Sequence, residues 1–328
     1  MKKYLIRTVC FLMVYVVVHV TAICIFGPWV TFYRIGDSGQ MYNRVLDIPN
    51  HKAPDILFIG SSHTYRGIDT RIFARAGVSA FNLGSSAQTP MQTELLLGKY
   101  LDEIAPKSVV FEVYPVLFQN DGVESTADLI SNDHIDAGLC RLAIESGNIK
   151  LINTLVYGIY QEYVCKIRTK TRQKDTIGDD LYVSGGYVEK MGHTSFFADD
   201  LVEPVSVTID PRQLMAFSNC VRMVNDRQLP YIIIKAPLPQ STNANLVGLK
   251  EFGEAMCSFG TYLDFNELMV LDDTCFFDSH HLTQSGVELF DSRLIQAMDS
   301  MGFVDQKVGF VRQGSYRNQS TSRFLSPN

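Results

Sequence analysis

The chain has 328 residues, of which 46% are hydrophobic, and its formal net charge at pH 7 is −6. This length and apolar content suffice for one large α/β domain with an insertion, and the mildly acidic charge argues against nucleic acid as a partner. None of the seven cysteines forms a Cys-x-x-Cys pair, which argues against a zinc or dithiol redox centre. We therefore expect no cofactor and no resident metal.

The first predicted element is a membrane anchor. Residues 8–30 contain no Asp, Glu, Lys or Arg, and basic residues precede them. At about 1.5 Å per residue this stretch spans roughly 34 Å, enough to cross a bilayer core. The basic flank predicts a cytoplasmic N-terminus, and Trp29, Phe32 and Tyr33 stand where an interfacial aromatic belt belongs. The alternative is a cleaved signal peptide, whose apolar region is usually only about 7–15 residues long.

Strand-like and helix-like segments alternate along the rest of the chain. We predict strands at 56–59, 78–83, 108–113, 231–234 and 261–265, and helices at 69–76, 89–104, 210–227 and 284–298. Such alternation implies parallel strands joined by right-handed crossovers. The predicted fold class is therefore α/β, a three-layer α/β/α sandwich with a parallel sheet.

One long segment interrupts this alternation. Residues 116–205 show no strand pair comparable to those of the sheet, and we expect a mainly helical insertion there. The insertion carries alternating basic residues: Lys166, Arg168, Lys170, Arg172 and Lys174. These would contact an anionic glycan or lipid headgroups, or they form an ordinary solvated surface.

The C-terminal tail is polar and poor in aliphatic residues, so we expect residues 313–328 to be disordered. The predicted organisation is a cytoplasmic stub and anchor at 1–34, an α/β domain at 35–312 and this tail.

Polar residues follow the first predicted strand directly, in the sequence Gly60-Ser61-Ser62-His63. Ligands of open parallel sheets collect at the carboxyl ends of the strands, so these side chains face the expected crevice. A serine becomes a nucleophile only when a base takes its proton and a third group orients that base. Asp278 and His281, separated by two residues just before the last helix, supply such a pair.

Other interpretations of these residues remain open. Asp278 could instead cap the final helix, and His280 competes with His281 for the role of base. Together with Asp272 or Asp273 the same residues could hold a metal, although adjacent histidines project in different directions. His63 either lines the crevice or is an ordinary turn residue.

Three short motifs in chain order resemble the SGNH (GDSL-type) hydrolase superfamily. They are Gly-x-Ser near the start, Asn-x-Gly after the second strand and Asp-x-x-His-Leu-Thr-x-x-Gly near the end. The resemblance covers about residues 54–115 and 228–300 and implies a flavodoxin-like sandwich. It implies Ser62 as the nucleophile, His281 as the general base and Asp278 as its partner. It also implies that the backbone N–H groups of Ser62 and Gly84 form an oxyanion hole.

The sequence departs from the family pattern in two places. Ser61 stands where the better-known members of the family have Asp. The resulting Gly-Ser-Ser is similar to the membrane-anchored exported branch of the family, which is linked to D-alanyl transfer to teichoic acids and to alginate O-acetylation. The Gly-x-Asn-Asp block of the family is missing, since residues 111–115 read Phe-Glu-Val-Tyr-Pro. A third oxyanion donor is therefore unassigned, and the amide of Gln88 is our candidate for it.

The resemblance implies a membrane-anchored, extracytoplasmic serine esterase or O-acyltransferase. Its expected substrate is an acylated carbohydrate of the cell envelope or another ester, and its intermediate is an acyl-serine. The alternative is a catalytically degenerate domain that binds glycan or supports an envelope complex of unidentified partners. The missing asparagine block favours this alternative, and the presence of Ser62, Asp278 and His281 opposes it.

Overall fold

The computed structural model describes residues 1–27, 39–166, 174–192 and 204–303. Its central sheet consists of β1 (Ile56–Ile59), β2 (Ala80–Asn82), β3 (Val109–Glu112), β8 (Tyr231–Lys235) and β10 (Tyr262–Asp264). The strand order is β10-β8-β3-β1-β2, and every neighbouring pair is parallel. This is the flavodoxin-like order, in which the direction of the connections reverses between β1 and β3. The predicted fold class is confirmed.

The central strands are buried on both faces. All four residues of β1 are 0% exposed, and successive side chains of a strand point to opposite faces. Leu57 and Ile59 therefore enter one core, whereas Ile56 and Phe58 enter the other. A strand covered by helices on both sides is apolar throughout, which is why these strands were recognisable as uninterrupted apolar runs.

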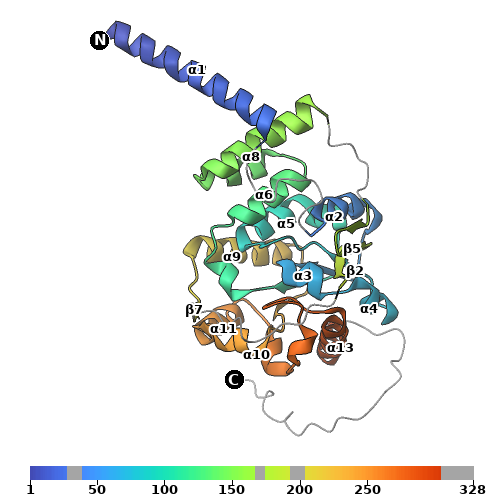
Figure 1. Ribbon diagram of the computed structural model, residues 1–328. Helices are drawn as coiled ribbons and strands as arrows, with labels where there is room; N and C mark the ends of the chain where they lie inside the picture. Colours follow the sequence, from blue (N-terminus) through green and yellow to red (C-terminus); the bar gives the residue numbers. More distant parts are fainter. Residues whose placement is uncertain (28–38, 167–173, 193–203, 304–328) are drawn as a thin grey trace.

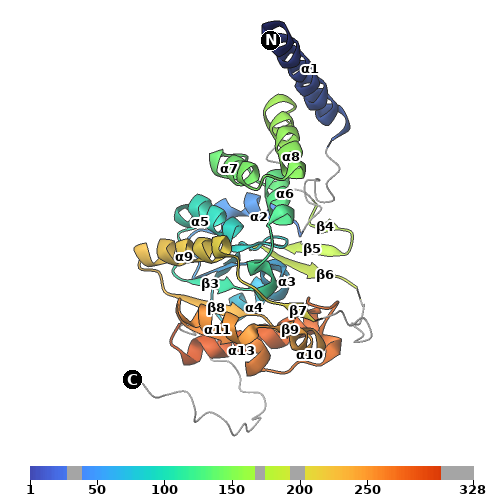
Figure 2. The same cartoon turned by 90° about the vertical axis from the view of Figure 1, so that its left-hand side faces the viewer.

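Helices cover both faces of the sheet (Figures 1 and 2). α5 (Pro90–Ile104), α9 (Pro211–Asp226) and α11 (Leu249–Cys257) contribute to the core on one face. α4 (Thr70–Arg75) and α13 (Gln284–Ser300) contribute to the core on the other face. α5 begins directly after Thr89, because the side chains of Thr89 and Gln92 form a capping box at its start.

The shorter elements join these layers. They are α2 (Met41–Asp47), η1 (Ile48–Asn50), α3 (Ser62–Gly67), η2 (Pro115–Phe118), α10 (Gln240–Ala244), β9 (Leu246–Val247), α12 (Phe265–Leu268) and η5 (Asp273–Cys275).

The insertion begins as predicted and then differs. Its first half forms α6 (Val123–Asn132), α7 (Ala137–Glu145), α8 (Ile149–Ile159) and the π-helical turn η3 (Tyr160–Val164). Its second half contains a three-stranded antiparallel sheet of β4 (Thr176–Ile177), β5 (Asp180–Val183) and β6 (Tyr187–Lys190). The short strand β7 (Val205–Ser206) follows and pairs with β9.

The prediction that residues 116–205 lack a strand pair is therefore wrong. The strands of this sheet are two to four residues long, too short to show a clear alternation in the sequence. Their turns use glycines in the left-handed region, with φ of 58° at Gly178 and 97° at both Gly185 and Gly186. Glycine adopts that region without steric cost. The glycines of these turns, rather than the strands themselves, were therefore the feature of the sequence from which this small sheet could have been predicted.

α1 (Lys2–Phe26) extends away from the domain (Figure 1). It has 25 residues, and an 18-residue window within it has a mean hydropathy of 2.6, so it is long and apolar enough to cross a membrane. An N-terminal signal sequence can meet the same criteria of length and composition. The predicted aromatic belt at Trp29, Phe32 and Tyr33, most of the basic run of the insertion and the predicted tail at 313–328 lie outside the described residues.

Candidate active site

The first predicted turn brings Ser62 to the carboxyl end of β1, beside the point where the sheet order reverses. Ser62 is the first residue of α3, and the Ser61 hydroxyl caps this helix by accepting the His63 N–H at 3.2 Å. Gly60 is needed because β3 passes close by. A Cβ on Gly60 would lie 2.7 Å from the carbonyl oxygen of Glu112.

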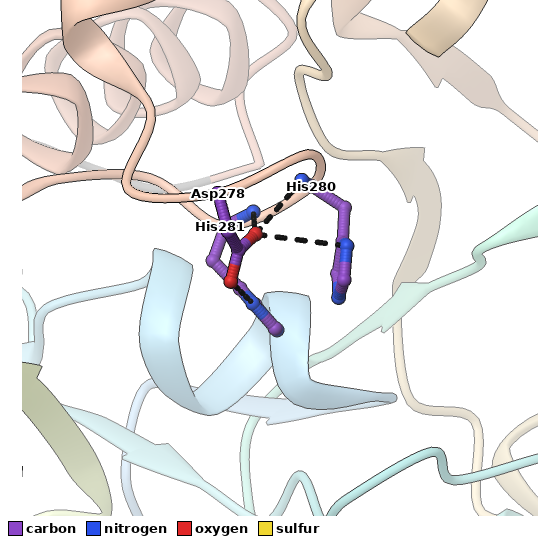
Figure 3. A group of neighbouring side chains, drawn as sticks. All are labelled: Asp278, His280 and His281. Carbon is purple, nitrogen blue, oxygen red and sulfur yellow. Dashed lines mark hydrogen bonds and ion pairs between the residues drawn. The ribbon is translucent and has the colours of Figure 1, made fainter. Parts of the chain in front are cut away.

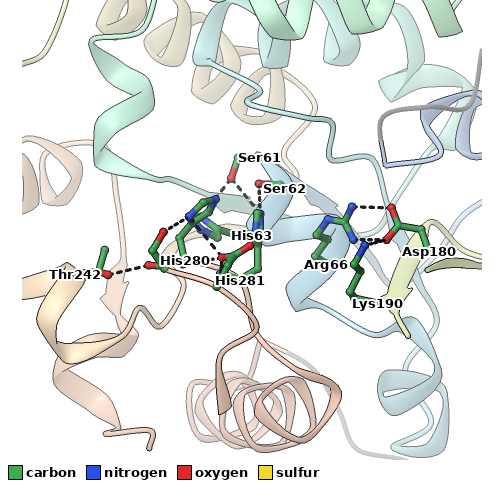
Figure 4. A network of polar contacts seen from close by, with 11 residues as sticks. Ser61, Ser62, His63, Arg66, Asp180, Lys190, Thr242, His280 and His281 are labelled. Carbon is green, nitrogen blue, oxygen red and sulfur yellow. Dashed lines mark hydrogen bonds and ion pairs between the residues drawn. The ribbon is translucent and has the colours of Figure 1, made fainter. Parts of the chain in front are cut away.

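Ser62, His281 and Asp278 form one hydrogen-bonded chain (Figure 4 shows Ser62 and His281). His281 Nε2 lies 2.8 Å from Ser62 Oγ, and His281 Nδ1 lies 2.8 Å from Asp278 Oδ2. An ionised carboxylate can only accept, so Nδ1 carries the proton and Nε2 of the neutral ring accepts the Ser62 hydroxyl. Such a tautomer is the one that a general base requires.

A tight turn holds Asp278 and His281 in register. Asp278 Oδ1 accepts the backbone N–H groups of His280 at 2.9 Å and of His281 at 2.8 Å. Thr242 fastens the same loop by donating its hydroxyl to the Ser279 carbonyl at 2.8 Å (Figure 4). Asp278 is not the cap of α13, because that position is Thr283.

His280 is not part of the chain. Its Nδ1 lies 3.0 Å from Ser279 Oγ and 3.6 Å from Asp278 Oδ1. Asp278, His280 and His281 do offer ligand atoms within 4.8 Å of one another (Figure 3). However, Asp278 Oδ2 and both ring nitrogens of His281 already take part in the contacts to each other and to Ser62. A metal there would compete with the serine chain.

Burial sets the protonation states of the site. It lowers the pKa of His281 below the ordinary value of 6.5, although Asp278 opposes the shift. Burial, with His281 beside it, lowers the pKa of His280 to about 3. Burial alone would raise the pKa of Asp278, but the hydrogen bond from His281, the charges of both histidines and the backbone N–H of His280 together outweigh it and keep that pKa well below its usual range. Near neutral pH the site therefore holds an ionised carboxylate and a neutral, basic imidazole.

Hydrolytic activity is expected to persist into the acid range. A lowered pKa means that His281 gains its inactivating proton only at lower pH, so the acid limb of kcat/KM should have its midpoint below pH 6.5. The measurement is kcat/KM for a short-chain acyl ester across the acid range, with circular dichroism at each pH to show that the fold persists. A midpoint at or above 6.5 in folded protein would contradict this prediction.

Glu112 is a site residue that the sequence analysis missed. It is the last residue of β3, and its side chain is 1% exposed. Its Oε2 accepts the Ser61 N–H at 2.9 Å, the Ser61 hydroxyl at 2.7 Å and the Thr64 hydroxyl at 3.3 Å. Burial alone would raise the pKa of Glu112, but the interactions with His63 and the two hydrogen bonds from Ser61 together outweigh it, and the pKa is lowered. One buried carboxylate thus fastens the turn that carries Ser62.

His63 lies on the buried side of the site and is 4% exposed. Its Nδ1 is 3.5 Å from Glu112 Oε1, and its ring centroid lies 5.6 Å from that of His281. Its Nε2 is buried and has no hydrogen-bond partner in the described part of the chain. Of the two alternatives left open by the sequence, the structure therefore places His63 in the site.

The three predicted oxyanion donors are in different states. The Ser62 N–H has no hydrogen-bond partner among the described residues. The Gly84 N–H donates to Asn82 Oδ1 at 3.1 Å. The Gln88 amide donates to Thr93 Oγ1 at 2.9 Å and accepts the Ser85 hydroxyl at 2.8 Å. The Ser62 N–H is thus the donor without a competing acceptor, and the roles of Gly84 and Gln88 stay predictions.

A cavity of about 160 Å³ lies against the triad, lined by Arg66, Lys190, Phe277, Asp278, His281 and Leu282. Asp180 neutralises part of its charge by pairing with Arg66 at 2.7 Å and Lys190 at 3.4 Å (Figure 4). A second cavity of about 740 Å³ lies between α5, α7 and α9 and includes no triad residue.

A parallel sheet in flavodoxin-like order, with a Ser-His-Asp chain at its switch point, is the architecture that the SGNH resemblance implied. No family model matches the chain, and no curated protein matches its sequence.

Two crystal structures from Bacteroides are similar to this chain. One is an acylhydrolase candidate from Bacteroides fragilis, with 13% identity and a TM-score of 0.40 over 80% of this chain and 97% of that chain. The other is a GDSL-like lipase from Bacteroides thetaiotaomicron, with 12% identity and a TM-score of 0.36 over 75% of this chain and 88% of that chain. Identities and TM-scores this low assign no activity to the chain.

Proposed function

We propose that this protein is a membrane-anchored serine esterase or O-acyltransferase of the SGNH type. The observation that carries the proposal is the hydrogen-bonded chain from Ser62 through His281 to Asp278, with 2.8 Å at each link. A serine hydroxyl is a weak nucleophile on its own, and this arrangement supplies both the base and the group that orients it. The lowered pKa of His281 keeps the base neutral, as the reaction requires.

The reaction proceeds in two halves. Ser62 Oγ attacks the acyl carbonyl carbon while its proton passes to His281 Nε2, and Asp278 stabilises the imidazolium that results. The Ser62 N–H stabilises the negative charge that develops on the carbonyl oxygen. The alcohol leaves with the proton of His281, and an acyl ester remains on Ser62. Water or a sugar hydroxyl, deprotonated by His281, then attacks this ester; the bond from the acyl carbon to Ser62 Oγ breaks, His281 returns the proton to Ser62, and the acyl group leaves as a free acid or a new ester.

We propose an acylated carbohydrate of the cell envelope as the substrate. The apolar stretch of α1 and the basic residues at its start, Lys2, Lys3 and Arg7, favour a domain on the outer side of a membrane, where such glycans are found. Phe277, beside the paired charges of Arg66 and Lys190, offers the aromatic and polar surface that a sugar ring needs next to the triad.

A fluorophosphonate probe tests the nucleophile directly. It is expected to add one phosphonyl group to Ser62, because the Ser62–His281 pair activates that hydroxyl in the resting protein. Intact mass followed by peptide mapping locates the adduct, and Ser62→Ala is the control that should remain unlabelled. Labelling at another serine, or none in folded protein, would refute the proposed enzyme.

One observation favours the alternative, a degenerate domain that binds glycan or supports an envelope complex. Both the Gly84 N–H and the Gln88 amide are engaged within the protein, which leaves one free oxyanion donor. Loss of one donor typically lowers kcat by a factor of about 10²–10³. The probe distinguishes the two, because a degenerate domain would bind glycan without forming the Ser62 adduct.

A further inference from the structure

The outward face of α8 is unusual for a surface helix. α8 packs on the domain through Leu151, Thr154, Leu155 and Gly158, which are buried. The opposite face of a surface helix is normally polar. In α8 and the turn after it that face carries Ile149, Ile152, Asn153, Val156, Tyr157, Tyr160 and Tyr163. The helix is therefore apolar on both sides and needs a second apolar environment.

Much of this surface is exposed. On this face Ile149 is 63% and Tyr163 56% exposed, and beside it Ile159 and Val164 are 40% and 68% exposed, as is Ile144 of α7 at 61%. Beyond α1, after residue 26, five of the twelve exposed large apolar side chains of the described structure lie between residues 144 and 164. Single exposed apolar residues need no explanation, but a cluster of this kind marks a contact surface.

The contact with α1 indicates which apolar environment this is. His19 Nε2 lies 3.1 Å from Asn153 Oδ1, and Ile23 of α1 is only 7% exposed. A Cβ on Gly27 would lie 3.7 Å from the Tyr157 ring. α8 thus lies beside the last eight residues of α1, from His19 to its end at Phe26, a stretch of about 10 Å. Interfacial helices lie at a comparable depth, about 5–10 Å into the headgroup–acyl boundary.

We propose that α8 and the turn that follows it lie in the surface of the lipid bilayer, beside the end of the anchor. The tyrosines at 157, 160 and 163 suit this position, because tyrosine, with an apolar ring and a polar hydroxyl, is enriched at membrane–water interfaces. This contact rests on the proposed anchor and goes beyond it. Two membrane contacts fix the orientation of the domain, whereas a single helix would let it rotate freely above the bilayer.

Lipid photo-crosslinking of the full chain in phospholipid vesicles tests the proposal. A photoreactive phenylalanine analogue replaces Ile159 or Val164, whose side chains are exposed, so the fold should tolerate it. Matched controls carry the analogue at Val270 and Leu289, which are 74% and 52% exposed and lie elsewhere on the domain. After irradiation, mass spectrometry should find phospholipid adducts at positions 159 and 164 and none at the two control positions.

Each other outcome overturns the proposal in a recognisable way. Adducts to a second protein at 159 and 164 would identify this surface as a protein interface, and adduct yields equal to the controls would mean that it faces water. Extraction with alkaline carbonate separates these results from failure of the anchor. If the protein stays in the membrane fraction without lipid adducts at α8, the surface is wrong and the anchor stands. Ser62 labelling by the fluorophosphonate probe reports on the enzymatic proposal independently.

Discussion

Ser62→Ala is expected to lower kcat/KM for acyl-ester hydrolysis by about 10⁴-fold or more, with little change in the free energy of unfolding. The loss is large because the acyl-enzyme route needs the hydroxyl that His281 Nε2 contacts at 2.8 Å. The fold should persist because the partner left behind, His281 Nε2, lies in a side chain that is 16% exposed and can reach water. Steady-state kinetics on a short-chain acyl ester and urea unfolding measure the two effects.

Three further variants make this expectation specific. His281→Ala should lose activity to a similar extent, because nucleophile and base act as a unit. Asp278→Ala should lose less, since an imidazole without its orienting carboxylate still adopts the productive tautomer part of the time. Ser61→Ala should lose far less activity than Ser62→Ala and about 1 kcal/mol of stability, because the Ser61 hydroxyl caps α3 and donates to Glu112 but contacts no member of the triad. Equal activity in Ser62→Ala and the parent protein would leave the degenerate domain as the better explanation.

The central sheet could be predicted because its strands are buried on both faces. Ile56 to Ile59 form β1 with the predicted bounds, the predicted strands at 78–83, 108–113 and 261–265 contain β2, β3 and β10, and β8 extends the predicted 231–234 by one residue to Lys235. α5 and α9 were equally accessible, since their apolar residues recur at helical spacing after clear start signals at Thr89 and Asp210. The proximity of Ser62 and His281, 219 residues apart, follows from two motifs that each end at the same edge of the sheet.

Features that depend on the packing of distant segments could not be predicted in this way. Glu112 ends an apolar run, and nothing in its local sequence shows that its carboxylate turns inward to Ser61. The short strands β4 to β6 are held by their turns and by contacts such as Arg66 with Asp180, which no periodicity reports. Whether a backbone N–H is free also depends on tertiary contacts, as the bond from Gly84 to Asn82 shows.

Glu112→Ala is expected to reduce the free energy of unfolding by about 3 kcal/mol and to lower kcat as well. The substitution removes the acceptor of the Ser61 N–H, the Ser61 hydroxyl and the Thr64 hydroxyl, and each of these groups is buried. It also leaves His63 without the carboxylate that lies 3.5 Å from its Nδ1. Urea unfolding measures the first effect, and steady-state kinetics on the folded variant measure the second.

Two comparisons separate positioning of the nucleophile from simple loss of structure. Glu112→Gln keeps the shape and one acceptor oxygen, so it should recover part of both losses, with kcat still reduced and KM near that of the parent. Asp102→Ala removes an exposed carboxylate paired with Arg227 at 2.6 Å and should change neither quantity measurably, because exposed ion pairs contribute little. If Glu112 positions the turn that carries Ser62, the folded Glu112→Gln protein will show a lowered kcat and slower labelling of Ser62 by the fluorophosphonate probe. Parental values of both kcat and labelling rate in that protein would reduce Glu112 to a purely structural residue. Its charge would then have no influence on Ser62, which is separated from the end of β1 only by Gly60 and Ser61.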